Sequence, residues 1–362
     1  MKNTISKNQL SIIVAISFTL TKIYVMPAKL SYWAGSSLWV CALINIVLDY
    51  FLLLLVLDFI KKSGNKSLFD VNSQLFSKNF ARVISLIFAV FFIVKAFVPI
   101  VEQKNSIELT FYETQPTLLT FMPFFVVAFY ILLKGYRAFA RGFEISLWVY
   151  VFAMTSIMLL SIFAGKYIAL LPLWTGSSKI INGSFKSLIW FGDPIYVLFF
   201  AGYISNAKTG LAKIKKAYVV SAITTLLVLI VFYAVFENIA PRQYFATLKM
   251  SKYSIALSNI GRFDYVSAFM LAAMCVLVVC LPLLFATTCL NECFSFKNKF
   301  IAPSIVIAFE VAFSIITQNE FLTTIQFMSN YVTWFFIAVN YIVPLIIYIL
   351  YKRRIKNGLQ TC

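Results

Sequence analysis

The sequence predicts an all-α, polytopic membrane protein with ten transmembrane helices, and three observations support this fold class. Of the 362 residues, 61% are apolar and only 12% are charged, with a mean hydropathy of +0.88, whereas a soluble domain is about half apolar and about a quarter charged. The apolar stretches are too long and continuous for barrel strands. Ten such stretches follow one another, so residues 1–362 are expected to form a single membrane domain.

Each expected span has roughly the length that crosses ~30 Å of hydrocarbon as a helix. Basic, acidic or Gly/Ser-containing loops separate them. In chain order they are Leu10–Ser31, Ser37–Ile60, Val83–Leu109, Thr117–Leu133, Glu144–Ala164, Ser184–Ile204, Ala217–Phe236, Asp264–Leu290, Ile301–Ile316 and Phe327–Leu350. The first span follows Lys2 and Lys7 as a signal peptide would, but no clean cleavage site follows, so we keep it as a span.

The basic residues predict how these spans are oriented. The N-terminus, the loops after spans two, four, six and eight, and the C-terminal tail hold twenty of the 31 Lys and Arg residues. Nine belong to the other face, and Lys22 and Lys95 lie within spans. Cytoplasmic loops carry the excess of Lys and Arg, so both termini are expected in the cytoplasm. The net charge of +18 then reflects a bilayer partner, and no nucleic-acid partner is expected.

Metal and cofactor chemistry has little support in the sequence. There is no histidine, and the six cysteines lie mostly in apolar segments, where thiols without other ligands nearby are expected to pack rather than bind metal. We therefore expect no metal site and no cofactor. No nucleophile–base motif is present, so an enzyme is not expected.

The ten spans divide into two five-helix repeats, residues 10–164 and 184–350. An odd number of spans per repeat makes the second repeat inverted, and a pair of interrupted helices at matching positions is then the best pointer to a binding site. Gly, Pro and buried charge all disturb a transmembrane helix. The first span of each repeat carries such an interruption, formed by Thr19, Thr21, Lys22 and Pro27 in the first and by Gly192, Asp193 and Pro194 in the second.

The two interruptions carry opposite charges, which suits a small zwitterion. A helix end and Lys22 would attract a carboxylate, and Asp193 would hold an ammonium group. The alternative is that Lys22 and Asp193 simply neutralise each other in a structural ion pair. Lys95 and Glu102 are seven residues apart on one helix face, and a buried structural pair is favoured there over a proton or ion path.

Three further polar residues lie within spans. Asp49 and Glu310 each allow two interpretations, as a packing contact or as a conduction residue. Thr287 is positioned to line a central cavity, although hydroxyl side chains in membrane helices usually bond their own backbone.

Several short motifs follow one another along nearly the whole chain. They are Ile5-Ser6-Lys7-Asn8-Gln9-Leu10, Pro27-Ala28, Ala34-Gly35, Trp39, Gln115-Pro116, Gly135, Arg141 with Glu144, Leu171-Pro172, Phe191-Gly192-Asp193 and Arg262-Phe263-Asp264. No single motif is specific, but in this order they resemble the spore germination permease family, the permease-like B subunits of germinant receptors. The chain departs from the family pattern at Leu20-Thr21, where glycine is frequent, and at Asp193, where glutamate is usual.

The resemblance implies an amino acid/polyamine/cation transporter fold with helices 1 and 6 broken. It also implies a place in the spore inner membrane, assembly with A and C receptor subunits, and binding of a small germinant such as an amino acid. The candidate ligand-binding residues are Thr19, Leu20, Thr21, Lys22, Lys95, Phe191, Gly192, Asp193 and Thr287.

Two functional hypotheses follow from the sequence. The leading one is a germinant receptor B subunit that binds a small nutrient and shifts a conformational equilibrium in its complex. The second is a secondary active amino acid transporter. The fold alone does not separate them, and the sequence identifies neither the ligand nor a coupling ion.

Overall fold

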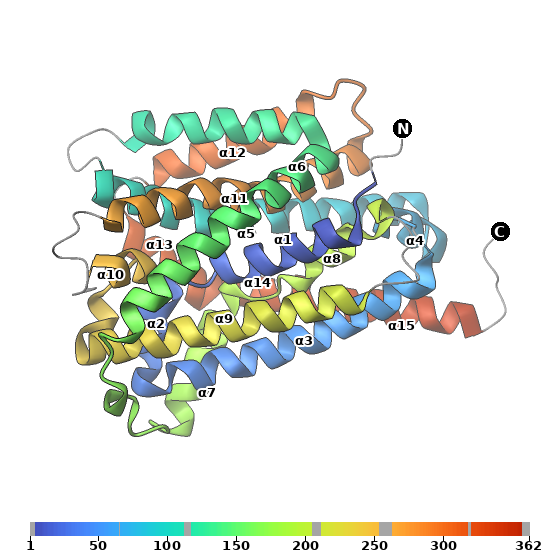
Figure 1. Cartoon of the computed structure of the whole chain (residues 1–362). Helices are drawn as coiled ribbons and strands as arrows, with labels where there is room; N and C mark the ends of the chain where they lie inside the picture. The colour runs from blue at the N-terminus through green and yellow to red at the C-terminus, as the bar shows by residue number, and fades with distance from the viewer. Residues whose placement is uncertain are drawn as a thin grey trace.

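The computed structural model describes residues 4–64, 66–111, 117–204, 211–252, 263–317 and 320–356, and helices account for nearly all of their regular structure. In these residues the β structure is limited to an isolated bridge between Ile5 and Ile204. The helices lie side by side in one bundle (Figure 1). The predicted all-α class is confirmed.

The first part of the chain forms two short helices, one long helix and then two longer runs. In order these elements are α1 (Lys7–Leu20), α2 (Met26–Ala34), η1 (Gly35–Ser37), α3 (Leu38–Ser63), α4 (Leu68–Leu75), α5 (Lys78–Phe111), α6 (Thr117–Ile162) and η2 (Tyr167–Leu170).

The second part repeats the pattern of short helices followed by long ones, and it ends in a helix that contains two π-helical turns. Its elements are α7 (Ser177–Ser187), η3 (Leu188–Trp190), α8 (Pro194–Phe199), η4 (Ala201–Tyr203), α9 (Ala212–Phe236), η5 (Glu237–Arg242), α10 (Ala246–Lys252), α11 (Phe263–Phe294), α12 (Ile301–Ile316), α13 (Phe321–Phe327), η7 (Met328–Val332), α14 (Thr333–Ile337), η8 (Ala338–Ile342) and α15 (Val343–Lys356).

Six helical runs in the described residues are long and apolar enough to cross a membrane: 26–63, 78–108, 121–162, 212–242, 269–294 and 321–354. The shorter apolar helix α12 adds sixteen residues. A continuous helix the length of α6, with 46 residues, would extend about 69 Å, over twice the ~30 Å of a hydrocarbon core. It turns at Gly135, where φ is 73° and ψ is −174°, and Figure 1 shows its two arms. Ten spans and an inverted repeat remain a prediction.

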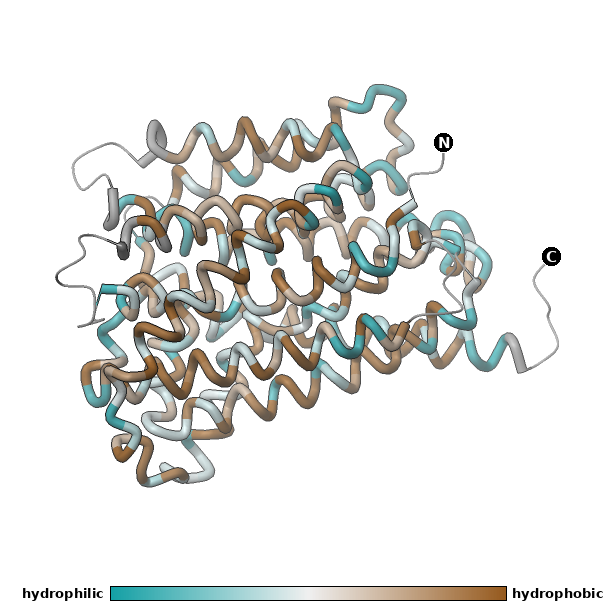
Figure 2. Tube along the Cα trace, in the orientation of Figure 1, coloured by the Kyte–Doolittle hydropathy of each residue, from teal (hydrophilic) through white to brown (hydrophobic). Residues whose placement is uncertain are grey.

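The two ends of the bundle differ from its middle. Hydrophobic residues dominate along the helices and hydrophilic residues gather at both ends (Figure 2). The start of α1 and the end of α15 lie at the same end of the bundle (Figure 1). This common end is what an even number of crossings requires.

The centre of the bundle is packed with aromatic rings. Phe92 of α5 contacts Tyr196 and Phe199 of α8, with ring centroids 5.9 and 4.8 Å apart. Phe285 of α11 packs on Phe92 and Tyr196 from the other side, at 5.3 and 5.7 Å. Offset and edge-on pairs of this kind stabilise beyond the area that they bury. They hold the short helix α8 against two long ones and so fix the place of the interruption before it.

Candidate functional site

The first interruption separates α1 from α2. Helix α1 begins at a capping box in which Ser6 and Gln9 bond each other's backbone N–H groups, and it ends at Leu20. The chain is irregular until Met26 starts α2. A helix end leaves carbonyl groups without partners, and the Lys22 ammonium donates to the Phe18 carbonyl at 2.9 Å. The lysine thus compensates for part of the break that it lies in.

The second interruption lies between η3 and α8. Gly192 has a φ of 82°, a left-handed conformation that residues with a Cβ rarely adopt. A Cβ on Gly192 would also lie 2.2 Å from Nδ2 of Asn340. Pro194 then starts α8 with a fixed φ and no N–H to satisfy. The positive φ favours glycine at this turn, and any side chain here would also force Asn340 to move.

The two interruptions meet at an ion pair in the centre of the bundle. Lys22 Nζ contacts Asp193 Oδ2, and the hydroxyl of Thr21 donates to the same oxygen at 3.3 Å. Lys95 Nζ from α5 approaches the other oxygen, Oδ1, to 3.3 Å. All three charged side chains are at most 5% exposed. One carboxylate therefore joins both broken helices to α5.

A second carboxylate, Asp49 of α3, compensates for the turn at Gly192. The Gly192 N–H lies 2.9 and 3.0 Å from the two Asp49 oxygens, and the Tyr341 hydroxyl donates to Oδ1 at 2.6 Å. Lys95 also donates to the Phe191 carbonyl at 2.5 Å. Two carboxylates and two ammonium groups thus balance in charge and cover backbone groups that the interruptions leave open, as an apolar surrounding requires.

The π-helical turn η8 supplies the remaining contacts of this junction. A π turn contains one residue more than an α turn and is frequent at functional sites. Here it brings two consecutive residues to the second interruption: Asn340 faces Gly192, and Tyr341 bonds Asp49. Both polar atoms of the Asn340 amide are buried without a hydrogen-bond partner. The amide is therefore an unused donor and acceptor directly beside the break.

Six of the nine residues predicted for the site lie at this junction. The other three form no hydrogen bond to the charged groups of the junction in the described structure. Two of them form hydrogen bonds with other groups, and the third is an apolar residue of the core. Thr19 donates to the Ala15 carbonyl and to Ser221, both at 3.0 Å, and Thr287 donates to the Leu284 carbonyl at 2.8 Å. Leu20 is the buried last residue of α1. The six at the junction are Thr21, Lys22, Lys95, Phe191, Gly192 and Asp193. Ligand binding by any of the nine stays a prediction.

The pairing expected between Lys95 and Glu102 does not occur. Lys95 turns to Asp193, and Glu102 accepts a hydrogen bond of 2.7 Å from the indole of Trp190. Seven residues along a helix are about 10.5 Å, so two side chains on one face still reach different levels of the neighbouring break. Sequence spacing gave the face correctly but not the partners.

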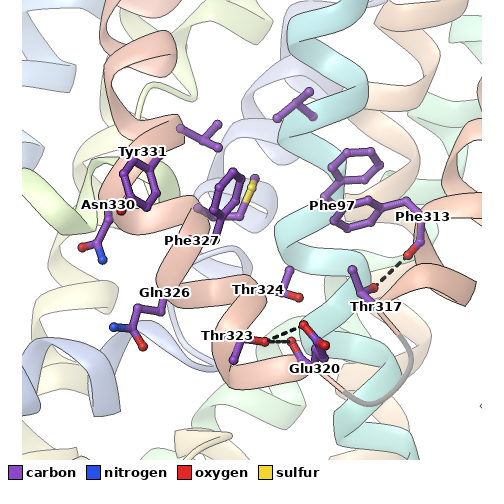
Figure 3. Close-up of a pocket in the computed structure, with 13 residues that line it drawn as sticks. Phe97, Phe313, Thr317, Glu320, Thr323, Thr324, Gln326, Phe327, Asn330 and Tyr331 are labelled. Atoms are coloured by element: carbon purple, nitrogen blue, oxygen red, sulfur yellow. Dashed lines mark hydrogen bonds between the residues drawn. The ribbon is translucent and has the colours of Figure 1, made fainter.

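Two cavities lie near these helices. One of about 20 Å³ touches the junction and is lined by Thr21, Lys95, Trp190 and Asp193 among others; this is room for little more than one water molecule. The other, of about 670 Å³, lies between α5, α12 and α13 and contains none of the predicted site residues. Figure 3 shows its stacked Phe97 and Phe313 rings apart from Phe327 and Tyr331. The central junction is therefore closed in this conformation.

A metal site finds no support in the described part of the chain, where no three His, Cys, Asp or Glu side chains are grouped to hold an ion. The junction instead offers paired charges, backbone ends and one free amide. Such a junction can exchange its internal ion pairs for those of a small charged ligand.

A helical membrane bundle in which two broken helices meet at buried charges is the architecture of secondary transporters. Solved structures agree on the fold. A mutant structure of the manganese transporter of Eremococcus coleocola is 13% identical to this chain, with a TM-score of 0.56. The superposition covers 93% of this chain and 77% of the transporter chain. A complex of that transporter with an aromatic bis-isothiourea substituted compound has a TM-score of 0.52 at 13% identity, covering 96% and 85%.

The family follows from the sequence match. A model of the family described as spore germination protein, a permease family, matches residues 4–322, so the chain belongs to the spore germination permease family. A search of curated proteins gave no match. The resemblance predicted from the sequence is confirmed, and the chain is a transporter-like membrane protein of spore germination.

Proposed function

We propose that this protein is the B subunit of a germinant receptor in the spore inner membrane, with both termini in the cytoplasm. It binds a small nutrient, an amino acid, at the junction of its two broken helices and acts together with A and C subunits. Binding then changes the conformation of the complex and triggers germination.

The observation that carries this proposal is the closed, charge-balanced junction. Asp193 holds two ammonium groups at once, and the adjoining cavity holds little more than a water molecule. A ligand with one positive and one negative group can enter only by replacing one of these contacts. Binding of the ligand would then move the broken helices. A receptor requires such a change of conformation on binding.

The alternative is a secondary active amino acid transporter. The same fold and the same closed junction support an occluded state between inward and outward openings. The two functions differ in whether ligand crosses the membrane, so the decisive measurement is transport.

Two assays on the same chain separate these functions. Spores that lack this gene, complemented with wild type, should germinate in response to amino acids. Purified protein in proteoliposomes should bind amino acids without accumulating radiolabelled ones. Saturable, gradient-driven accumulation would overturn the receptor assignment in favour of the transporter, and unchanged germination of the deletion strain on every amino acid would remove the germinant role.

A further inference from the structure

We propose that Glu102 is the group that receives the ammonium of the ligand, while Lys95 receives its carboxylate. The proposal rests on the proposed function, because it places the ligand beside the broken helices. It assigns the ligand to the class of amino acids with a free ammonium group. It also gives the orientation of the bound ligand, with its ammonium group toward Glu102.

The carboxylates at the breaks already have partners. Asp193 is held by Lys22 and Thr21 on one oxygen and by Lys95 on the other. Asp49 receives the Gly192 N–H on both oxygens and a tyrosine hydroxyl on one. An ammonium group arriving at either one would meet an existing donor and two nearby lysines.

Glu102 differs from both. Its side chain is buried, at 3% exposure for the residue, and it forms no ion pair with any residue that the structure describes. Its hydrogen-bond donor is the neutral indole of Trp190 at 2.7 Å. A buried carboxylate without a cation is poorly compensated. A ligand ammonium is the partner that the site lacks.

A second, independent observation lies beside Glu102. The Tyr24 hydroxyl, in the first interruption, is buried and has no hydrogen-bond partner. It lies next to the Cys275 thiol of α11 and close to Glu102. A buried hydroxyl whose neighbour is only a weakly bonding thiol can supply another contact for an incoming polar group. The first interruption and the residue directly before the second one therefore both contribute a side chain here, Tyr24 and Trp190.

The small cavity lies between Lys95 and Trp190, the residue whose indole donates to Glu102. It is lined by Lys95 and Pro99 of α5, by Val278 and Pro282 of α11, and by Trp190. A proline inside a helix removes the donor for the carbonyl four residues earlier, so Pro99 and Pro282 leave the carbonyls of Lys95 and Val278 without helical donors. The cavity is thus bordered by two residues with freed acceptors, which suit an ammonium group, and by the Lys95 ammonium, which suits a carboxylate.

Trp190 occupies the ligand's place at Glu102 in this conformation. It is the last residue of η3, directly before the second interruption. When an ammonium displaces the indole, the end of η3 is released from α5. This exchange links recognition of the amine to movement of the broken helix.

The test is equilibrium dialysis of the purified full chain against a mixture of the twenty ¹⁴C-labelled standard L-amino acids. Wild type should retain one or a few of them, and Glu102→Gln should retain at least tenfold less. The matched control is Glu292→Gln, which removes the same charge from a glutamate on α11 that likewise accepts a hydrogen bond from a neutral donor, Ser85, at 3.2 Å, and its retention should equal that of wild type.

Competition with an analogue of the retained amino acid that lacks the amino group tests the orientation of the bound ligand. Wild type should prefer the amino acid at least tenfold, and Glu102→Gln should lose this preference. Glu102→Asp, which keeps the charge, should recover part of it and checks for misfolding. If both Glu102 variants bind and discriminate as wild type does, the Glu102 assignment is overturned and the proposed function stands. If wild type retains no amino acid, the proposed function itself fails.

Discussion

Asp193 pairs with two opposite charges at the central junction, whereas Lys22 pairs with one. Asp193 accepts from two ammonium groups and a hydroxyl, while Lys22 contacts one carboxylate, a backbone carbonyl and the Thr21 hydroxyl. Removing one side of a buried ion pair leaves an uncompensated charge, and such changes cost about 3–5 kcal/mol. The two neutral substitutions should therefore differ in effect.

Asp193→Asn is expected to destabilise the protein more than Lys22→Met. The first leaves two buried lysines without their carboxylate and should cost about 3–5 kcal/mol; the second leaves Asp193 paired with Lys95 and should cost less. The measurement is thermal unfolding of the detergent-solubilised chain. Lys62→Met is the control, since it breaks a partly exposed pair with Asp58 that should contribute less than about 1 kcal/mol. Equal loss for Lys22→Met and Asp193→Asn would show that Lys95 does not share the carboxylate.

The sequence predicted the central charges of the site but not their full set of partners. Lys22 and Asp193 were visible because charge within an apolar span is rare. The contact of Lys95 with Asp193, and the capping of Gly192 by Asp49, depend on helices that are far apart in sequence. Asn340 and Tyr341 gave no signal, because single Asn and Tyr residues are ordinary in such spans.

At the scale of elements, the interruptions and the π turn form one unit. The breaks before α2 and α8 expose backbone groups, and η8 places Asn340 and Tyr341 against the second of them. A π turn holds one residue more than an α turn, so it shifts the register of Asn340 and Tyr341 relative to a regular α-helix. The extra residue of the π turn is therefore part of the junction.

Tyr341→Phe is expected to destabilise the protein by about 1.5–3 kcal/mol, the usual contribution of a hydrogen bond to a charged group. The hydroxyl is lost while the ring stays, so Asp49 keeps only the Gly192 N–H. Thermal unfolding again gives the measurement. Tyr348→Phe removes the same kind of bond, to the partly exposed Asp58, and should change stability less. Equal effects of the two variants would contradict a special role of η8.

For the whole molecule, the prediction concerns topology. If the chain crosses ten times, a periplasmic-type reporter fused after Ser178, at the start of α7, should be active outside the membrane. A fusion after Lys356, at the end of α15, should be inactive. The physical reason is the excess of Lys and Arg at the ends expected inside. An inactive fusion after Ser178, with normal expression, would contradict the ten-span arrangement.

The sequence by itself determined the membrane environment, the helical class and the family. These properties depend on composition and on the order of local motifs, such as an apolar run or a Gly-Asp-Pro interruption, and each is present before the chain folds. The helix end near Trp190 belongs to this group, because Gly192 and Pro194 act on the backbone next to it.

Only the tertiary structure decided which charges meet. It paired Lys95 with Asp193 instead of Glu102, because the packing of α5 against the second break sets the level that each side chain reaches. It also closed the junction, since aromatic packing around α8 leaves a cavity of about 20 Å³. Contacts between helices distant in sequence arise from the shape of the whole bundle, and no local pattern encodes them.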